Sequence, residues 1–202
     1  MFGLILGIVG SIASSIAGAL TVGSKIFLTV ANALTAFASA LGVTQEKDAE
    51  SLGNRVIQAE EEGITPDKFE EYDDYLKAID EFEIDEEKSK EIDTNDKLLR
   101  GLDVSAKAIE AKFPEHDVAG FLTSVTLSEE NKSYFASESF KSILEEIKTN
   151  PDLIDSLSKL LQGKEMPENE YYDVIDRLST IEKRLDPTKT ESEIAEHLRS
   201  LG

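Results

Sequence analysis

Few side chains in this sequence could do chemistry, because its 202 residues include two histidines, no cysteine and no tryptophan. His116 follows a Phe-Pro break, and His197 has Glu193 one helical turn before it, but neither has a second histidine nearby. A lone imidazole of this kind indicates a surface or capping group more often than a catalytic base or metal ligand. We therefore assign no catalytic role to either histidine.

Carboxylates are so frequent that any pair of them says little about a site. The acidic tracts at 60–62 and 85–87 lack the glycine and the spaced oxygen ligands of a calcium-binding EF-hand loop. The N-terminal glycines are not followed by Lys-Ser/Thr, as a phosphate-binding loop requires, and no serine lies in a G-x-S-x-G motif. The sequence predicts no metal site, no cofactor and no enzymatic activity.

Charge divides the chain into unlike parts. Lys and Arg total 21 against 41 Asp and Glu, and the net charge of −20 repels phosphate backbones and argues against a nucleic-acid partner. Between 1 and 43 the only charged residue is Lys25, whereas residues 46–91 carry 18 acidic and 6 basic side chains. We therefore expect a boundary near Thr44.

The first half of the uncharged segment predicts a helix from Met1 to Val22. Large apolar residues recur every three or four positions on one stripe, and small residues fill another. Small residues four apart allow two helix backbones to approach closely. Glycine inside a helix costs about 1 kcal/mol relative to alanine, so a packing partner must compensate. The small residues of this self-packing or membrane face are Gly3, Gly7, Gly10, Ser14 and Gly18.

A second apolar helix is predicted from Ile26 to Val43, after a turn at 23–25. It has a weakly polar stripe of Thr29, Asn32, Thr35 and Ser39. This stripe faces away from large residues that extend the same self-packing or membrane face, namely Phe27, Leu34 and Phe37. Two helices joined by a tight turn form a hairpin.

Several interpretations of this hairpin compete. A cleaved signal peptide would have a charged first region, which is missing here. A membrane hairpin fits the length and the lack of charge, and a hairpin buried among copies inside an oligomer fits the small residues equally well. A core helix that is hidden until membrane contact, as in colicin-like pore formers, is less favoured at the extreme N-terminus without flanking amphipathic helices.

The remaining sequence has the 3.6-residue periodicity of helices, and no segment alternates long enough to predict a strand. The expected fold class is all-α, with an N-terminal hydrophobic helical hairpin followed by an acidic multi-helix domain. The expected divisions are a hairpin at 1–43, an acidic connector at 44–94 and a soluble helical domain at 95–202. Helices are predicted at 45–62, from 66 onward, and at 95–112, 117–127, 135–148, 151–161, 167–185 and 190–201. Residues 85–94 are dense in charge and poor in apolar side chains, and are predicted to form a linker or an exposed helix end.

The connector contains one apolar helix face that could bind a partner. Thr65 and Pro66 are suited to the start of a helix, and carboxylates surround its apolar stripe. We call this stripe the partner face; it consists of Phe69, Tyr72, Leu76 and Ile79.

These features predict a structural, non-enzymatic component of an oligomeric assembly. Its hairpin would be anchored in a membrane or in the lumen of a phage-tail-like injection or secretion machine. We therefore expect the protein to be membrane-associated or inside a large particle, rather than a free cytosolic monomer. The expected partners are copies of itself, other assembly subunits and a lipid bilayer. Over about 43 residues the leader is similar in texture to hydrophobic stretches of phage tape-measure and ejection proteins and of membrane-embedded secretion subunits, without a shared motif.

Two other functions remain open. The first is a pore-forming toxin or bacteriocin-like effector, in which the hairpin enters a target membrane. The second is an acidic helical adaptor or chaperone that uses the partner face to bind a basic amphipathic helix.

Overall fold

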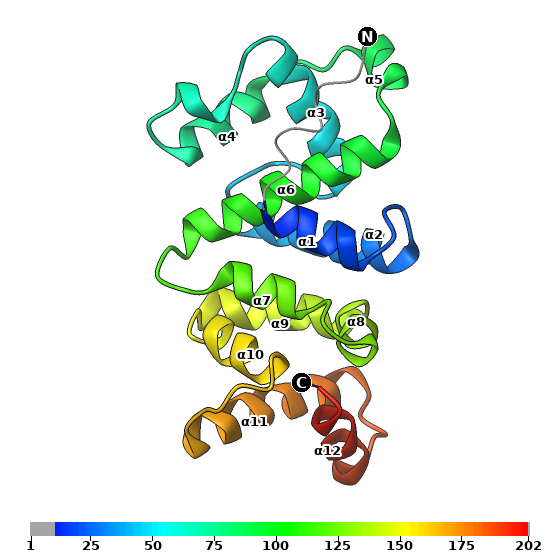
Figure 1. Ribbon diagram of the computed structural model, residues 1–202, viewed down its shortest axis with the longest axis vertical. Helices are drawn as coiled ribbons and strands as arrows, with labels where there is room; N and C mark the ends of the chain where they lie inside the picture. The colour runs from blue at the N-terminus through cyan, green and yellow to red at the C-terminus, as the bar shows by residue number, and fades with distance from the viewer. Residues whose placement is uncertain (1–10, 202) are drawn as a thin grey trace. The chain divides into compact units, whose positions relative to one another are not determined.

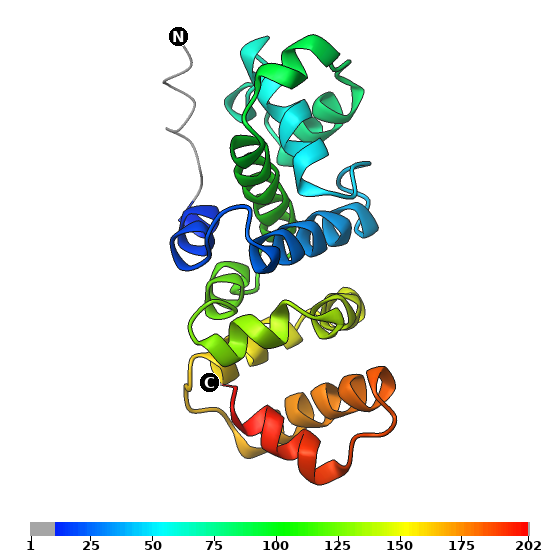
Figure 2. The ribbon, with the colours of Figure 1, turned by 90° about the vertical axis from the view of Figure 1, so that its right-hand side faces the viewer.

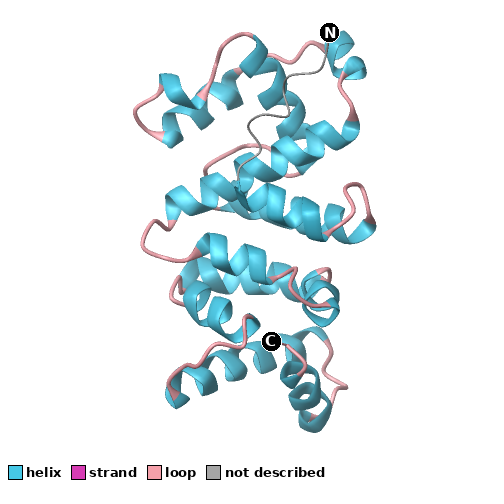
Figure 3. Ribbon diagram, viewed as in Figure 1, coloured by secondary structure: helices cyan, strands magenta, loops and turns pink. Residues whose placement is uncertain are grey.

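Helices account for all the regular secondary structure in the computed structural model, which describes residues 11–201. Within that range there are 12 α-helices and no strands, so the predicted all-α class is confirmed (Figure 1, Figure 3). The chain divides into two units between Lys112 and Phe113. The divisions expected from composition, at 43/44 and 94/95, do not coincide with this break, and as domain boundaries they stay predictions.

Unit 1 is organised around its last helix, α6. Helices α1, α2, α3 and α4 all pack on α6, which therefore buries residues on more than one side (Figure 1, Figure 2). Its buried residues include Leu98, Leu102 and Ile109, as the apolar stripe predicts, but also Arg100 and Asp103. The elements are α1 (Ser11–Ala19), α2 (Lys25–Ala40), α3 (Ala49–Glu61), the 3-10 helix η2 (Pro66–Lys68), α4 (Tyr72–Glu81), α5 (Glu86–Glu91) and α6 (Thr94–Lys112).

The α3–α6 contact depends on two glycines where the helix backbones touch. A Cβ atom on Gly53 of α3 would stand 1.7 Å from the carbonyl oxygen of Lys97. One on Gly101 of α6 would stand 1.9 Å from the carbonyl oxygen of Ala49. No side chain fits at such distances, so this close crossing requires glycine at both positions.

The uncharged N-terminal helices are part of this unit. Ile12 and Ile16 of α1, and Leu20 just after it, are buried in the core, and α1 packs on α6. One residue of the polar stripe of α2, Thr35, is buried in the core, where the Thr35 and Ser105 hydroxyl oxygens lie 2.8 Å apart. The structure does not confirm a hairpin that stands apart from an acidic domain, because both helices pack on α6 more than on each other.

In the described range 11–201, no helix combines the length and the apolar composition needed to span a bilayer. Of the predicted helix from Met1 to Val22, the part within the described residues is helical from Ser11 to Ala19.

Unit 2 is a second helical core, built from large side chains. Phe121, Phe135 and Phe140 pack ring against ring at centroid distances between 5.4 and 6.5 Å. The buried Asn131 amide donates to the carbonyl oxygen of Ser124 at 3.0 Å and so ties α8 to α7. The helices are α7 (Val118–Ser124), α8 (Glu129–Phe135), α9 (Glu138–Thr149), α10 (Leu153–Leu161), α11 (Glu168–Leu185) and α12 (Glu191–Arg199).

Three local predictions need correction. The chain after Thr65 forms the short η2 and then extends through Phe69 before α4 begins, so it is not one continuous helix. Residues read as a linker or helix end after Asp85 form α5, because the Asp85 carboxylate accepts from two backbone amides. Residues 135–148 contain the end of α8 and most of α9, separated by a turn at Ser137.

Candidate functional sites

A buried ionic cluster joins α3, α4 and α6 in unit 1; we call it the Arg100 cluster. The Arg100 guanidinium donates to Asp103 Oδ2 at 2.6 Å and, from Nε, to Glu60 Oε2 at 3.1 Å. Lys107 lies 3.0 Å from Asp103 Oδ2, and the Tyr75 hydroxyl donates to Glu60 Oε1 at 3.0 Å. The Arg100 and Asp103 side chains are 6% and 2% exposed, so both charges are withdrawn from water.

The electrostatics of the Arg100 cluster favour fixed charges rather than proton transfer. Burial opposes the charge of Arg100, but the hydrogen bond to Glu60 and the negative charges of Glu60 and Asp103 together outweigh it, and the pKa of Arg100 is raised. Burial and the negative charge of Glu60 raise the pKa of Tyr75. Burial and Asp103 raise the pKa of Tyr72. Because all three groups keep their protons at neutral pH, the hydrogen bonds that Arg100 and Tyr75 donate are permanent.

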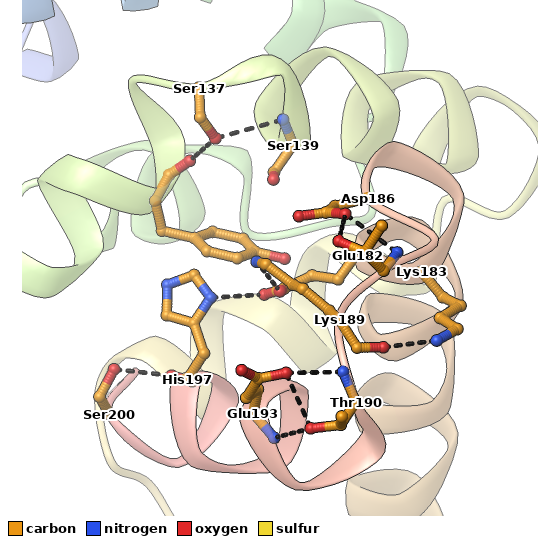
Figure 4. Close-up of polar contacts among 12 residues, drawn as sticks. Ser137, Ser139, Glu182, Lys183, Asp186, Lys189, Thr190, Glu193, His197 and Ser200 are labelled. Atoms are coloured by element: carbon orange, nitrogen blue, oxygen red, sulfur yellow. Dashed lines mark hydrogen bonds and ion pairs between the residues drawn. The ribbon is translucent and has the colours of Figure 1, made fainter.

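Unit 2 has a buried carboxylate instead, on the inner face of α11. Glu182 Oε2 lies 2.7 Å from Lys189 Nζ, and Glu182 Oε1 lies 2.8 Å from His197 Nδ1 (Figure 4). The Tyr134 ring of α8 meets the His197 ring edge-on at 5.2 Å. We call these four residues the Glu182 cluster. It links α8, α11, α12 and the loop between the last two helices.

The loop that delivers Lys189 and the start of α12 are tightly hydrogen-bonded. Asp186 accepts from the backbone amide of Thr188 at 3.0 Å (Figure 4). Thr190 and Glu193 form a reciprocal capping box at the first turn of α12 (Figure 4). Hydrogen bonds from Thr188 lower the pKa of Asp186, and those from Thr190 lower the pKa of Glu193.

A carboxylate beside an imidazole can take part in acid–base chemistry, provided that a substrate reaches it. The Glu182 side chain is 1% exposed, and Lys189 already neutralises it. Burial, followed by the charge of Glu182, raises the pKa of Tyr134, so the phenol remains neutral. This geometry supports a role in holding α12 against α11.

His116 is also paired, within unit 2. Its Nδ1 lies 2.8 Å from Asp155 Oδ2, and the other oxygen of Asp155 accepts from the Asp117 amide at 2.8 Å. Asp155 thus joins the start of α7 to α10. Among the described residues, no three His, Cys, Asp or Glu side chains are grouped so that they could hold a metal ion.

The predicted self-packing face is divided by the structure. Gly3, Gly7 and Gly10 lie outside the described residues. Ser14 and Gly18 are on the exposed side of α1, and a Cβ atom on Gly18 would have no atom within 4 Å. The α2 members of the face are in the core, since Phe27, Leu34 and Phe37 are at most 3% exposed.

The partner face is turned largely inward. Leu76 and Ile79 are buried, and α4 packs on α3 and α6. The rings of Phe69 and Tyr72 are half-buried and lie 5.9 and 5.4 Å from the Tyr75 ring. In this conformation Leu76 and Ile79 are not accessible to a partner helix.

Sequence reasoning missed both buried clusters. Glu182 directly follows Ile181 and comes four residues after Leu178, so it borders the apolar stripe of α11. That position was the available signal for a buried carboxylate. Arg100 and Asp103 had no such signal, because the stripe of α6 marks one side of a helix that is buried on several.

The fold and its ionic clusters define a two-unit, all-α protein whose most buried charges hold helices together. Comparisons of the chain with protein-family models, with curated proteins and with solved structures found no match.

Proposed function

We propose that this protein is a non-enzymatic structural subunit of an oligomeric assembly, in which copies associate through the small-residue side of α1. One observation carries the proposal: Ser14 and Gly18 form an exposed strip on a helix whose large residues are already in the core. The strip has no charged residue from Ser11 to Ser24. Such a surface allows a second helix backbone to approach closely, with few side chains to order.

The burial of α2 within its own chain favours association through protein packing. Thr35 faces Ser105 on α6, and Asn32 accepts a hydrogen bond from the Ala49 amide at 3.0 Å. Thr35 and Asn32 therefore have their partners within the same chain, whereas the small-residue side of α1 is exposed. An injection or secretion machine that is built from repeated subunits would use such a surface.

The test uses the full chain, because removing residues 1–44 would strip α1 and α2 from α6. Size-exclusion chromatography with light scattering should show a defined oligomer for the unmodified protein. Gly18→Leu should convert it to monomers, since the added side chain meets open space within the subunit but blocks close approach between subunits.

Thr180→Leu is the matched control, because it adds the same side chain at an exposed position of α11 and should leave the oligomer intact. Circular dichroism should show unchanged helicity for both variants. A monodisperse monomer of the unmodified protein in buffer, across micromolar concentrations, rejects the proposal.

A pore-forming effector is the second candidate, favoured by the burial of an uncharged helix under α6. After Lys25, α2 has no charged residue. The absence of native cysteine makes a direct lock available: Thr35→Cys with Ser105→Cys replaces two hydroxyls that are 2.8 Å apart. If α2 leaves α6 to insert, the oxidised variant should release no dye from liposomes, and reduction should restore release. Equal release before and after reduction contradicts this function.

A further inference from the structure

Unit 2 contains a small cavity between the end of α10, the first turn of α11 and the end of α12. Its volume is about 250 Å³. Pockets for drug-sized ligands measure roughly 300–1,000 Å³, so this cavity suits a smaller molecule. Its apolar lining consists of Leu160, Met166, Tyr171, Leu198 and Leu201.

The charged residues of this cavity are unusual for so acidic a chain. Lys164 and Arg199 line it, and among the described residues no Asp or Glu does, although the chain has 41 acidic residues and 21 basic ones. Within residues 11–201, neither cation forms an ion pair or a side-chain hydrogen bond. Lys164 and Arg199 are both exposed.

The backbone turn at the end of α10 places Lys164 beside the cavity. Gly163 ends α10 with a φ of +61°, and the Lys164 amide donates back to the Lys159 carbonyl at 2.9 Å. This closed turn is the Schellman ending of a helix, in which glycine takes the left-handed conformation. Lys164 therefore leaves the helix in a set direction, while Arg199 comes from the last turn of α12.

We propose that this cavity binds a small amphiphilic carboxylate, with its hydrocarbon part among Leu160, Leu198 and Leu201 and its anionic head at Lys164 and Arg199. Two cations beside apolar lining residues complement such a ligand. The guanidinium and ammonium groups make charge-assisted hydrogen bonds to carboxylate oxygens. The leucines, at most 8% exposed, provide the apolar contact.

The experiment titrates the full chain with octanoate and follows binding by calorimetry and by NMR shifts of the Leu198 and Leu201 methyl groups. Octanoate should bind with a millimolar or tighter Kd. Acetate lacks the hydrocarbon tail and octan-1-ol lacks the charge, so each should bind about tenfold more weakly or worse. Octylammonium should not bind, because its charge has the wrong sign.

Lys164→Gln with Arg199→Gln should weaken octanoate binding at least about tenfold, since each charged contact contributes on that scale. Arg184→Gln is the matched control: it removes an exposed cation of α11 outside the cavity and should leave Kd unchanged. Met166→Trp should also weaken binding, because a larger side chain fills the cavity.

The proposal is overturned if octanoate does not bind at millimolar concentration. It is equally overturned if octanoate binds the double variant as well as it binds the unmodified protein, or if acetate binds as tightly as octanoate. These outcomes are independent of oligomer formation, because the cavity is entirely in unit 2 and the α1 strip is in unit 1.

Discussion

The two units bury charge in opposite ways. In unit 1 a cation, Arg100, lies between the carboxylates of Glu60 and Asp103, and its side chain is 6% exposed. In unit 2 a carboxylate, Glu182, lies between Lys189 and His197, whose side chains are 35% and 42% exposed. Water can therefore reach the partners of Glu182 far more readily than those of Arg100. A buried carboxylate can thus be paired with side chains that reach water, whereas the buried guanidinium of Arg100 is paired with carboxylates that are themselves at most 15% exposed.

The helix contacts differ between the units as well. Unit 1 brings α3 and α6 together at Gly53 and Gly101, whereas unit 2 separates its helices with the rings of Phe121, Phe135 and Phe140. Close backbones leave no room for adjustment, while aromatic cores tolerate small shifts. Unit 1 should therefore respond more sharply to single substitutions, and peptide-resolved hydrogen exchange on the full chain can compare the two units directly.

The largest effect is expected from Arg100→Met. It leaves Glu60 and Asp103 buried without their main cation, a loss that costs about 3–5 kcal/mol of unfolding free energy for a buried pair. Denaturant unfolding should show this loss, and exchange should rise in α3, α4 and α6. Lys90→Ala removes an exposed ion pair with Glu87 and should change the free energy by less than about 0.5 kcal/mol. If both variants lowered the free energy of unfolding equally, burial would not determine how much the Arg100 cluster stabilises the fold.

Gly53→Ala should also lower the free energy of unfolding, by less than Arg100→Met does. The added methyl group would meet backbone at 1.7 Å, so α3 and α6 must separate, at a cost of about 3 kcal/mol. Gly18→Ala is the control, because its methyl group meets open space and alanine favours a helix by about 1 kcal/mol. The midpoint temperature of thermal unfolding should fall for Gly53→Ala and should stay unchanged or rise for Gly18→Ala.

Glu182→Gln tests the buried carboxylate of unit 2. Its amide keeps the shape but loses the charge that Lys189 and His197 face, so we expect a loss of about 2 kcal/mol, as for hydrogen bonds to charged groups. The loss is smaller than for Arg100→Met because water can solvate both partners. Faster exchange should be confined to α11 and α12. A loss larger than that of Arg100→Met would invert the comparison.

A pair of tyrosine variants separates satisfied from unsatisfied hydroxyls in unit 1. Tyr75→Phe removes the hydrogen bond to Glu60 and should cost about 1–2 kcal/mol. Among the described residues, the buried Tyr72 hydroxyl has no hydrogen-bond partner, so Tyr72→Phe should be neutral or stabilising. Urea unfolding of the two variants provides the measurement, and an equal loss in both would contradict the assignment.

The smallest expected effects are those of pH, and they have opposite signs in the two units. Glu170, Asp186 and Glu193 of unit 2 have lowered pKa values, so their stabilisation is present above the ordinary values of 4.5 and 3.8 and is lost as pH falls through the folded values. Tyr72 and Tyr75 of unit 1 have raised pKa values, so their stabilisation is present below 10.0 and is lost at higher pH.

Hydrogen exchange should thus show unit 2 weakening first in acid and unit 1 weakening first in alkali. Tyr134, whose pKa is also raised, contributes an alkaline loss to unit 2, and Asp67, whose pKa is lowered, contributes an acid loss to unit 1. Most of the shifted groups in unit 1 therefore have raised pKa values and respond to alkali, whereas most of those in unit 2 have lowered pKa values and respond to acid. If both units lost their protection from exchange at the same pH, in acid and in alkali alike, the result would contradict this prediction.

Local order was predictable from the sequence because it depends on neighbours along the chain. The 3.6-residue period and the capping residues predicted most of the helices, and Gly63 and Gly163 end α3 and α10 in left-handed conformations as expected of helix stops. The 3-10 turn at η2 was missed because Thr65 and Pro66 start one helical turn as readily as a long helix.

Tertiary structure decided which helix faces meet, and local pattern carries no such information. The sequence by itself determined an acidic, all-helical chain with an uncharged start. Only the structure showed that α6, assigned by composition to the later domain, packs on α1 and α2, and that Leu76 and Ile79 face inward. The same holds for the Arg100 cluster, because a charged residue can be buried only when partners distant in sequence arrive to pair with it.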